Sequence, residues 1–489
     1  MAHYPTYSNH RDISPKGLIY LCLILGLGGM AYGLVTQNWI IFIGITLLPL
    51  SLLLAFVFFK QPLWSYVLLG VICCYFHAIY RYSGSIPGLS GIIDVAAFIC
   101  LLSLIINRLG TYSSYEWKNA INVLTICQAI WVLYCILSLL APYTKVHNPL
   151  TTRGMFITIP LIYLLSSILM CTPKRLKYTF FLLGIFIVTA AFKLVWQRRK
   201  GFDSMEVAYL LDTESWQTHL LSTGIRYFSF FSDAGNFGIT MGTFTAVFGL
   251  LTFIVKKRLA FLFCLSITIL SAVGMFMSGT RSAIAIPLGG LLLYTLINKN
   301  LKQFFTCSLT GILLFSFFYF TNIGDDNTFI RRMRTAFRPT EDASYNVRAE
   351  NRKLFAYYLA EKPFGVGVGG RIEDSKNLSR GRIAERIPTD ASYVDRWAEN
   401  GIVGLCLYLS IIGAILIRSC YLILYRIRND QLRKMLSALL CSIFGLWITG
   451  TAGQAMEAYP CTFLIPLFLA FVQNGPYIDK QLARNEIIA

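Results

Sequence analysis

The sequence predicts an all-α polytopic membrane protein of about 14 transmembrane helices with a large helical extracytoplasmic loop. Its 489 residues are 56% hydrophobic and 14% charged, and the mean hydropathy is +0.60. Soluble globular proteins carry about 25% charged residues, so this chain has too few charges to cover a water-facing surface of its size. The chain also contains many apolar runs, each close to the ~20 residues that cross a hydrocarbon core.

These runs are continuously apolar rather than alternating, which favours membrane helices over the strands of a β-barrel. The segment before Gly17 is polar, and no small-residue cleavage site follows the first run. We therefore expect a retained first helix rather than a removed signal peptide. In chain order, the predicted spans lie at 17–35, 39–59, 63–81, 91–107, 119–141, 154–172, 178–196, 236–255, 259–278, 281–297, 302–321, 401–425, 432–450 and 456–474.

The charges of the short loops predict the orientation. With the N-terminus inside, the predicted inner loops are basic, for example 174–177, 256–258 and 426–434, whereas the short outer loops are nearly free of basic residues. This asymmetry follows the positive-inside rule for a protein with both termini in the cytoplasm. Much of the net charge of +19 therefore reflects topology. Membrane lipids are expected partners, and nucleic acid is not.

Two segments, 197–235 and 322–400, are longer than the other loops and are expected to face outward. Such long loops are uncommon unless they are functional or have structure of their own. In the second, TFIRRMRTAF and NVRAENRKLFAYYLAEKP have helical spacing and predict short amphipathic helices. The chain then divides into N-terminal transmembrane helices with the first large outer loop (1–235), core transmembrane helices bearing SGTRSA (236–321), the large outer loop (322–400) and C-terminal transmembrane helices (401–489).

The 13 cysteines are scattered, lie nearly all within apolar spans and form no CxxC pair. This distribution is typical of small buried hydrophobic residues rather than of a metal or redox site. We therefore expect neither a metal ion nor another cofactor.

Arginines at the edges of the spans are candidate functional residues. Arg226 precedes the span that begins near Asn236, and Arg281 lies in the short turn MFMSGTRSAIAI beside Ser278. Charge at a membrane boundary is costly and usually has a partner, which an anionic lipid headgroup would supply. Snorkelling of Arg281 toward ordinary headgroups is the alternative.

The long loop 322–400 is also rich in arginine. The planar guanidinium suits bidentate binding of phosphate or carboxylate. Arg348 and Arg352 lie one turn apart on one face of a predicted helix and are the candidates for such binding. Acidic residues are nearly as numerous in this loop, so a solvated, salt-bridged surface explains most of the other arginines.

The stretch EKPFGVGVGGR, residues 361–371, has the glycine spacing of a phosphate-binding loop. It follows a helix rather than a strand and is expected on the outer side, which argues against a nucleotide site. Pro363 would end the helix and the glycines would free the backbone, so a flexible hinge explains the pattern. Alternatively, backbone N–H groups near Gly367 and Arg371 line a binding site.

Four segments together resemble the O-antigen ligase and polymerase superfamily. They are the Arg226 loop leading into GNFG, the turn SGTRSA, the helix VRAENRKLFAYYLAEKPFGVGVGG and the segment TDASYVDRWAENGIVGLCLYL, and the likeness is clearest over about residues 220–425. The resemblance implies a metal-independent glycosyltransferase of the membrane GT-C type, in the bacterial inner membrane with its active site on the periplasmic face. The implied donor is a glycan on undecaprenyl pyrophosphate, and the implied acceptor is a glycan or a lipid-linked acceptor.

The resemblance also implies roles for single residues. Arginines would stabilise the leaving lipid pyrophosphate, because preorganised charge in a dry site strongly stabilises a transition state. The expected catalytic residues are Arg226, Arg281, Arg348 and Asp390. The expected substrate-binding residues are Asn236, Ser278, Arg352, Gly367, Arg371 and Glu399.

The general base departs from the ligase pattern. Lipid A-core ligases carry a histidine before the aromatic residue of the last motif, whereas this chain has TDASY there and no histidine in the long loop. Asp390 is the nearest substitute, followed by Asp395 and Glu399, although helix capping and the helix dipole explain Asp390 and Glu399 equally well. His219, seven residues before Arg226, could reach the site, but an ordinary surface histidine is the simpler expectation.

The missing histidine favours an O-antigen or exopolysaccharide polymerase, which moves a growing glycan from its lipid carrier onto the next lipid-linked repeat unit. The alternative is a ligase that delivers the glycan to lipid A-core or to a protein. A flippase of lipid-linked glycan is a third hypothesis. Transporters, however, place charges and broken helices mid-membrane in two related halves, and this sequence has few charges within its spans.

Overall fold

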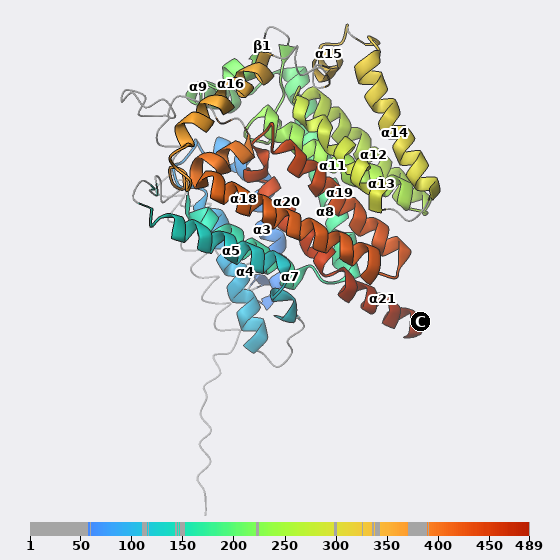
Figure 1. The fold of residues 1–489 in the computed structure, drawn as a ribbon. Coiled ribbons are helices and arrows are strands. Elements are labelled where there is room, and N and C mark those ends of the chain that lie inside the picture. Colours follow the sequence, from blue (N-terminus) through green and yellow to red (C-terminus); the bar gives the residue numbers. More distant parts are fainter. Residues whose placement is uncertain are drawn as a thin grey trace, which may run out of the picture. The chain divides into compact units, whose positions relative to one another are not determined.

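The computed structural model describes residues 57–58, 60–109, 115, 117–141, 144, 146, 152–221, 224–297, 301–324, 326–334, 337, 343–369, 389 and 391–488 (Figure 1). The chain divides into two compact units, one of residues 1–67 and 98–114 and one of residues 68–97 and 115–489. Within the first unit, the Ser103 hydroxyl donates a hydrogen bond to the carbonyl of Phe58 (2.8 Å). The second unit contains every residue of the candidate site described below.

Seven helices among the described residues are long and apolar enough to cross a membrane, and a bent pair would make an eighth. This result confirms the all-α polytopic membrane class. The seven are α3 (Pro62–Tyr82), α4 (Gly91–Leu109), α8 (Pro173–Lys200), α11 (Ala234–Ile254), α12 (Arg258–Met277), α18 with its continuation η8 (Ser392–Tyr421 and Leu422–Arg426), and α19 (Asp430–Thr449). The bent pair is α20 (Cys461–Gln473) with α21 (Gly475–Ile488), at an angle of 52°.

The expected count of about 14 spans is not confirmed. The first two predicted spans lie almost entirely outside the described residues. Four others correspond to shorter apolar helices of 10–17 residues. These are α5 (Val123–Ser138), η2 with α7 (Gly154–Thr158 and Ile159–Leu169), η3 with α13 (Arg281–Ile284 and Ala285–Ile297), and the Phe304–Phe320 part of α14 (Leu301–Phe320).

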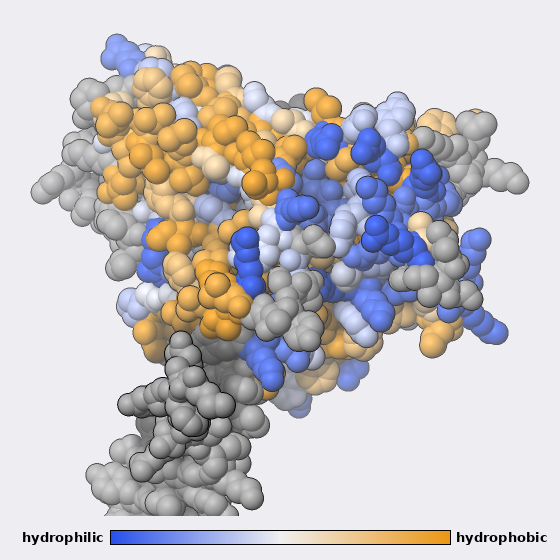
Figure 2. Space-filling model, turned by 90° about the horizontal axis from the view of Figure 1, so that it is seen from below, coloured by the Kyte–Doolittle hydropathy of each residue, from blue (hydrophilic) through white to orange (hydrophobic). Residues whose placement is uncertain are grey.

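Helices α11 and α19 form the centre of the second unit. In their most apolar stretches, 78% and 72% of the residues are buried, against 28% in α12. A helix that is hydrophobic on all sides is buried when other helices surround it. Side chains of α8 such as Phe181 (55% exposed) and Phe192 (69%) instead face outward, as lipid-facing residues do. Figure 2, which views the molecule from below, shows hydrophilic residues gathered beside a hydrophobic surface.

Short elements lie between the long helices. Both amphipathic helices expected in 322–400 are present, as α15 and α16, and Figure 1 places them at the same end of the molecule as α9 and β1. The hairpin strands pair antiparallel, with Leu220 opposite Ile225. The elements are η1 (Trp117–Ala120), α9 (Ser204–Asp212), α10 (Trp216–His219), β1 (Leu220–Leu221), β2 (Gly224–Ile225), α15 (Thr328–Arg334), α16 (Ala343–Leu359) and η9 (Ala455–Glu457).

The glycine run after α16 docks on a kink in α18. Gly401 interrupts α18 with φ 68° and ψ −175°. The N–H groups of Val366 and Gly367 donate to the carbonyls of Ala398 and Glu399, at 2.9 and 3.0 Å. The run therefore completes the hydrogen bonds of the interrupted helix rather than acting as a free hinge.

Replacing Gly401 with alanine is expected to destabilise the protein by about 2 kcal/mol or more, because its φ is left-handed and a Cβ would lie 2.0 Å from the Pro363 carbonyl oxygen. Gly413→Ala in the same helix is the matched control, since nothing lies within 4 Å of its Cβ. That variant is expected to be neutral or slightly stabilising. Thermal unfolding in detergent, followed by tryptophan fluorescence, measures both, and equal midpoints would contradict the strained packing at Gly401.

Candidate active site

The SGTR turn between α12 and η3 is the centre of the site. Gly279 has φ +62°, a conformation that favours glycine. A Cβ at this position would meet Arg332, with Cδ and Nη1 at 3.3 Å, and Arg226, with Cγ at 3.5 Å. Two arginines from distant parts of the chain therefore lie over one glycine, beside Arg281 of the same turn.

Arg226 is held in place by two backbone carbonyls and one side-chain hydroxyl. Its Nε donates to the Ser278 carbonyl (3.1 Å), its Nη1 to the Thr218 carbonyl (3.2 Å) and its Nη2 to Thr280 Oγ1 (3.1 Å). Burial, followed by the positive charge of Arg332, lowers the pKa of Arg226 to about 10. The guanidinium is still protonated at neutral pH, but in surroundings that a bound anion would stabilise.

Helix α15 directs Arg332 toward this turn. On its other side, Met333 is fully buried in an apolar cluster with Ile284 and Phe318, and Ile330 packs against the same cluster. Arg332 was not among the candidate residues selected from the sequence, where a salt-bridged surface explained most arginines of the long loop. The sequence did contain a pattern that could have identified Arg332. The spacing of the apolar residues Ile330 and Met333 gives α15 a buried face, and Arg332 does not lie on that face.

A cavity of about 980 Å³ opens at these arginines. Ligand pockets of proteins typically measure about 300–1,000 Å³, so this one can hold a large headgroup. Guanidinium groups suit bidentate binding of phosphate, and their convergence on one cavity favours an anionic ligand. Among the described residues, four arginines line the cavity, Arg226, Arg281, Arg332 and Arg348, together with two carboxylates, Asp233 and Glu457.

The cavity brings together several of the residues expected from the sequence. Arg226, Arg281, Arg348 and Asn236 line it. Arg352 lies at its margin, where Nη2 donates to the carbonyl of the lining residue Thr451 (2.7 Å).

Three other expected site residues, Ser278, Gly367 and Glu399, do not line the cavity. Ser278 is buried, donates to the Met275 carbonyl (2.7 Å) and accepts from the Thr280 N–H (3.1 Å), so it shapes the turn. Gly367 binds α18 through its backbone, and Glu399 forms an ion pair with Arg396 (3.1 Å). Arg371 and Asp390 lie outside the described residues.

His219 is not a surface histidine, and that expectation is wrong. Its side chain is 1% exposed, and Nδ1 lies 2.8 Å from the Ser215 carbonyl, which can only accept. Nε2 accepts the N–H of Ala234 (3.1 Å). Both ring nitrogens are therefore used by the backbone, and burial lowers the pKa of His219. The ring supports the start of α11 as a neutral group and is not placed to act as a base.

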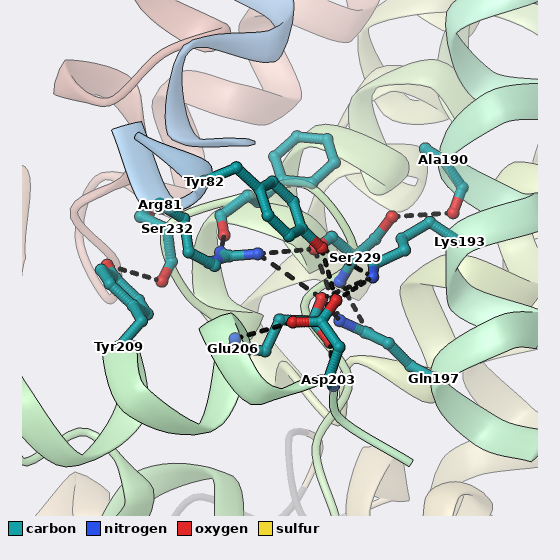
Figure 3. Close-up of polar contacts among 11 residues, drawn as sticks. Arg81, Tyr82, Ala190, Lys193, Gln197, Asp203, Glu206, Tyr209, Ser229 and Ser232 are labelled. Atoms are coloured by element: carbon teal, nitrogen blue, oxygen red, sulfur yellow. Dashed lines mark hydrogen bonds and ion pairs between the residues drawn. The ribbon is translucent and has the colours of Figure 1, made fainter. Parts of the chain in front are cut away.

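A buried polar network holds the segment between Arg226 and α11 (Figure 3). Arg81 on α3 donates to the carbonyls of Ser229 (3.2 Å) and Phe231 (2.5 Å) and pairs with Glu206 (3.7 Å). Gln197 on α8 accepts the Ser229 N–H (2.9 Å) and donates to Glu206 (2.8 Å). Because Ser229 has φ +50°, these bonds hold a backbone conformation that an isolated chain would avoid.

The same segment ends at Asp233, which caps α11. Its Oδ1 accepts the N–H of Asn236 (2.9 Å), and its Oδ2 accepts the Ser232 hydroxyl (2.7 Å). The amide of Asn236 donates to the Tyr459 carbonyl (2.8 Å), so the start of α11 is tied to the loop between α19 and α20. Asp233 was not among the residues selected from the sequence, although SDAGNFG contains a helix cap directly before GNFG.

The fold and the site define a polytopic helical membrane protein with an arginine-lined cavity. Residues 266–409 match the family model described as O-antigen ligase. The match over this part of the chain confirms the resemblance to the O-antigen ligase and polymerase superfamily, whose members are glycosyltransferase-like enzymes. No curated protein matches the chain. Among the described residues, no group of three or more His, Cys, Asp or Glu side chains could hold a metal ion.

Proposed function

We propose that the protein polymerises lipid-linked oligosaccharide repeat units, as an O-antigen or exopolysaccharide polymerase. It transfers the growing glycan from undecaprenyl pyrophosphate to a hydroxyl of the acceptor sugar, at the periplasmic face of the bacterial inner membrane. The matched family supports glycan transfer, and the convergence of four arginines on one cavity is the observation that carries the choice of donor.

The proposed donor explains why the site is built from arginines. When the bond between the anomeric carbon and the phosphate oxygen breaks, its electron pair leaves with the pyrophosphate, which gains negative charge. Fixed cations in a water-excluded site stabilise that charge without reorganisation. Arg226 and Arg332 are preorganised over Gly279, and Arg281 and Arg348 lie on the same cavity wall.

A ligase is the second candidate, and the description of the matched family favours it. Two observations support the polymerase instead. The long loop contains no histidine in the position where lipid A-core ligases carry one, and the nearby His219 has both ring nitrogens engaged by the backbone. A flippase would not need the arginines to converge at one end of the spans.

Deletion of the gene in its native host separates these candidates. We expect surface glycan limited to a single repeat unit, because polymerisation stops while ligation continues. Full-length polymer that accumulates on the lipid carrier would instead show a ligase. Gel electrophoresis of surface glycan and mass spectrometry of the extracted lipid-linked glycan distinguish the two results, and complementation with the wild-type gene is the control.

A further inference from the structure

The loop between α19 and α20, residues 450–460, carries the second carboxylate of the cavity. This loop is held from two sides. The N–H groups of Ser392 and Tyr393, at the start of α18, donate to the carbonyls of Gly453 (3.0 Å) and Gly450 (3.2 Å). From the other side, the Asn236 amide donates to the Tyr459 carbonyl (2.8 Å). A side chain on this loop therefore has a defined position relative to the arginine turn.

Glu457 ends η9 in this loop and lines the cavity. Its Oε1 is buried and lies 2.9 Å from Nη2 of Arg396. Arg396 also pairs with Glu399 (3.1 Å), so it is held between two carboxylates. The side chain of Glu457 is nevertheless 29% exposed, against 12% for Glu399. Arg396 thus holds the buried Oε1, and the 29% exposure of the side chain leaves Oε2 as the oxygen that a ligand in the cavity would meet.

The other carboxylate of the cavity is less suited to accept a proton. Each oxygen of Asp233 already accepts a hydrogen bond, one from the Asn236 N–H and one from the Ser232 hydroxyl. Protonation of Asp233 would weaken the cap of α11 and the turn that holds Arg226. Among the described lining residues, Glu457 is therefore the carboxylate that can accept a proton without disturbing the arginines that line the cavity.

We propose that Glu457 is the general base of the transfer, an assignment that rests on the proposed function. The acceptor hydroxyl oxygen attacks the anomeric carbon of the donor, and its proton passes to Glu457 Oε2. The new glycosidic bond forms as the bond to the phosphate oxygen breaks, and that electron pair leaves with the lipid pyrophosphate. Glu457 then returns the proton to water. General-base catalysis of this kind contributes about 10²–10⁴-fold to a rate.

Glu457→Gln and Glu457→Ala test the assignment in the purified full-length protein, reconstituted with lipid-linked glycan. We expect both to lose transfer by about 100-fold or more, while binding of the lipid-linked donor is unchanged. Azide ion is a nucleophile without a proton to lose. It is therefore expected to restore release of polyprenyl pyrophosphate in Glu457→Ala, with formation of a glycosyl azide. Glu361→Gln, an exposed carboxyl just beyond α16, is the control and keeps wild-type activity.

Each alternative result has a distinct meaning. If Glu457→Gln transfers glycan as fast as an active wild-type protein, Glu457 is not the general base, and the proposed function is unaffected. The same conclusion follows from a Glu457→Ala variant that binds donor but gives no glycosyl azide, because a purely structural loss is not repaired by azide. A folded wild-type protein that consumes no lipid-linked glycan would overturn the proposed function itself.

Discussion

Arg226→Ala and Arg281→Ala are each expected to abolish glycan chain growth while the protein still reaches the membrane. Loss of one preorganised donor to a developing charge typically costs about 10²–10³-fold in rate. Arg226 has an additional role, because its guanidinium joins the Thr218 carbonyl to the SGTR turn through Ser278 and Thr280. Surface glycan from a deletion strain that carries each variant measures the effect, with the protein quantified in isolated membranes.

The control for charge removal is Lys353→Ala. Lys353 is exposed on α16, the helix that carries Arg348, and it does not line the cavity. Its loss is expected to leave chain growth unchanged. Arg226→Lys tests the planar guanidinium group separately from its charge, since lysine keeps the positive charge but cannot make the three contacts together. Normal polymer from both alanine variants would contradict an enzymatic role for the arginine cavity.

Arg81→Met is expected to lower the free energy of unfolding by about 3–5 kcal/mol, because it breaks a fully buried ion pair and removes the Arg81 donor from the carbonyls of Ser229 and Phe231. Methionine approximates the volume of the arginine stem, so the loss would not reflect a large cavity. The same variant is expected to reduce glycan transfer in the folded fraction, since Ser229 and Phe231 lie between Arg226 and Asp233. Thermal unfolding in detergent measures stability, and transfer per folded protein measures the positioning effect.

Arg433→Ala is the matched control for this ion pair. Arg433 pairs with Asp430, whose side chain is 57% exposed, so the pair is worth less than about 1 kcal/mol. If Arg81→Met and Arg433→Ala unfold at the same temperature, the buried network of Arg81 does not stabilise the segment between Arg226 and α11.

The helical spans could be predicted from the sequence because each one is determined by the residues of its own segment. A continuous run of apolar residues must satisfy its own backbone in lipid, and only a helix does so within one segment. The structure begins and ends α11 and α12 within two residues of the predicted 236–255 and 259–278. The arginines at span edges were also visible locally, since charge beside an apolar run is unusual whatever its partners are.

Which residues of the long loop reach the cavity could not be predicted from their neighbours in the sequence. Arg332 and Arg334 occupy one short helix, yet Arg332 lies over Gly279, whereas Arg334 is buried and donates to the Ile323 carbonyl (3.0 Å). Their different positions depend on how α15 packs against α12 and α14. Similarly, Gly367 was expected at the site because of its neighbours in sequence, but its N–H completes the kinked helix α18.

A helical membrane protein with arginines at the edges of its spans could be predicted from the sequence, because hydropathy and boundary charge act within single segments. Which of these charges share one cavity depends on how distant segments pack together. Arg226, Arg332 and Glu457 come from three separate loops, and their meeting depends on the packing of α11, α15 and α19 around the SGTR turn. Such long-range packing has no local signature, because each helix could bury the same apolar face against many partners.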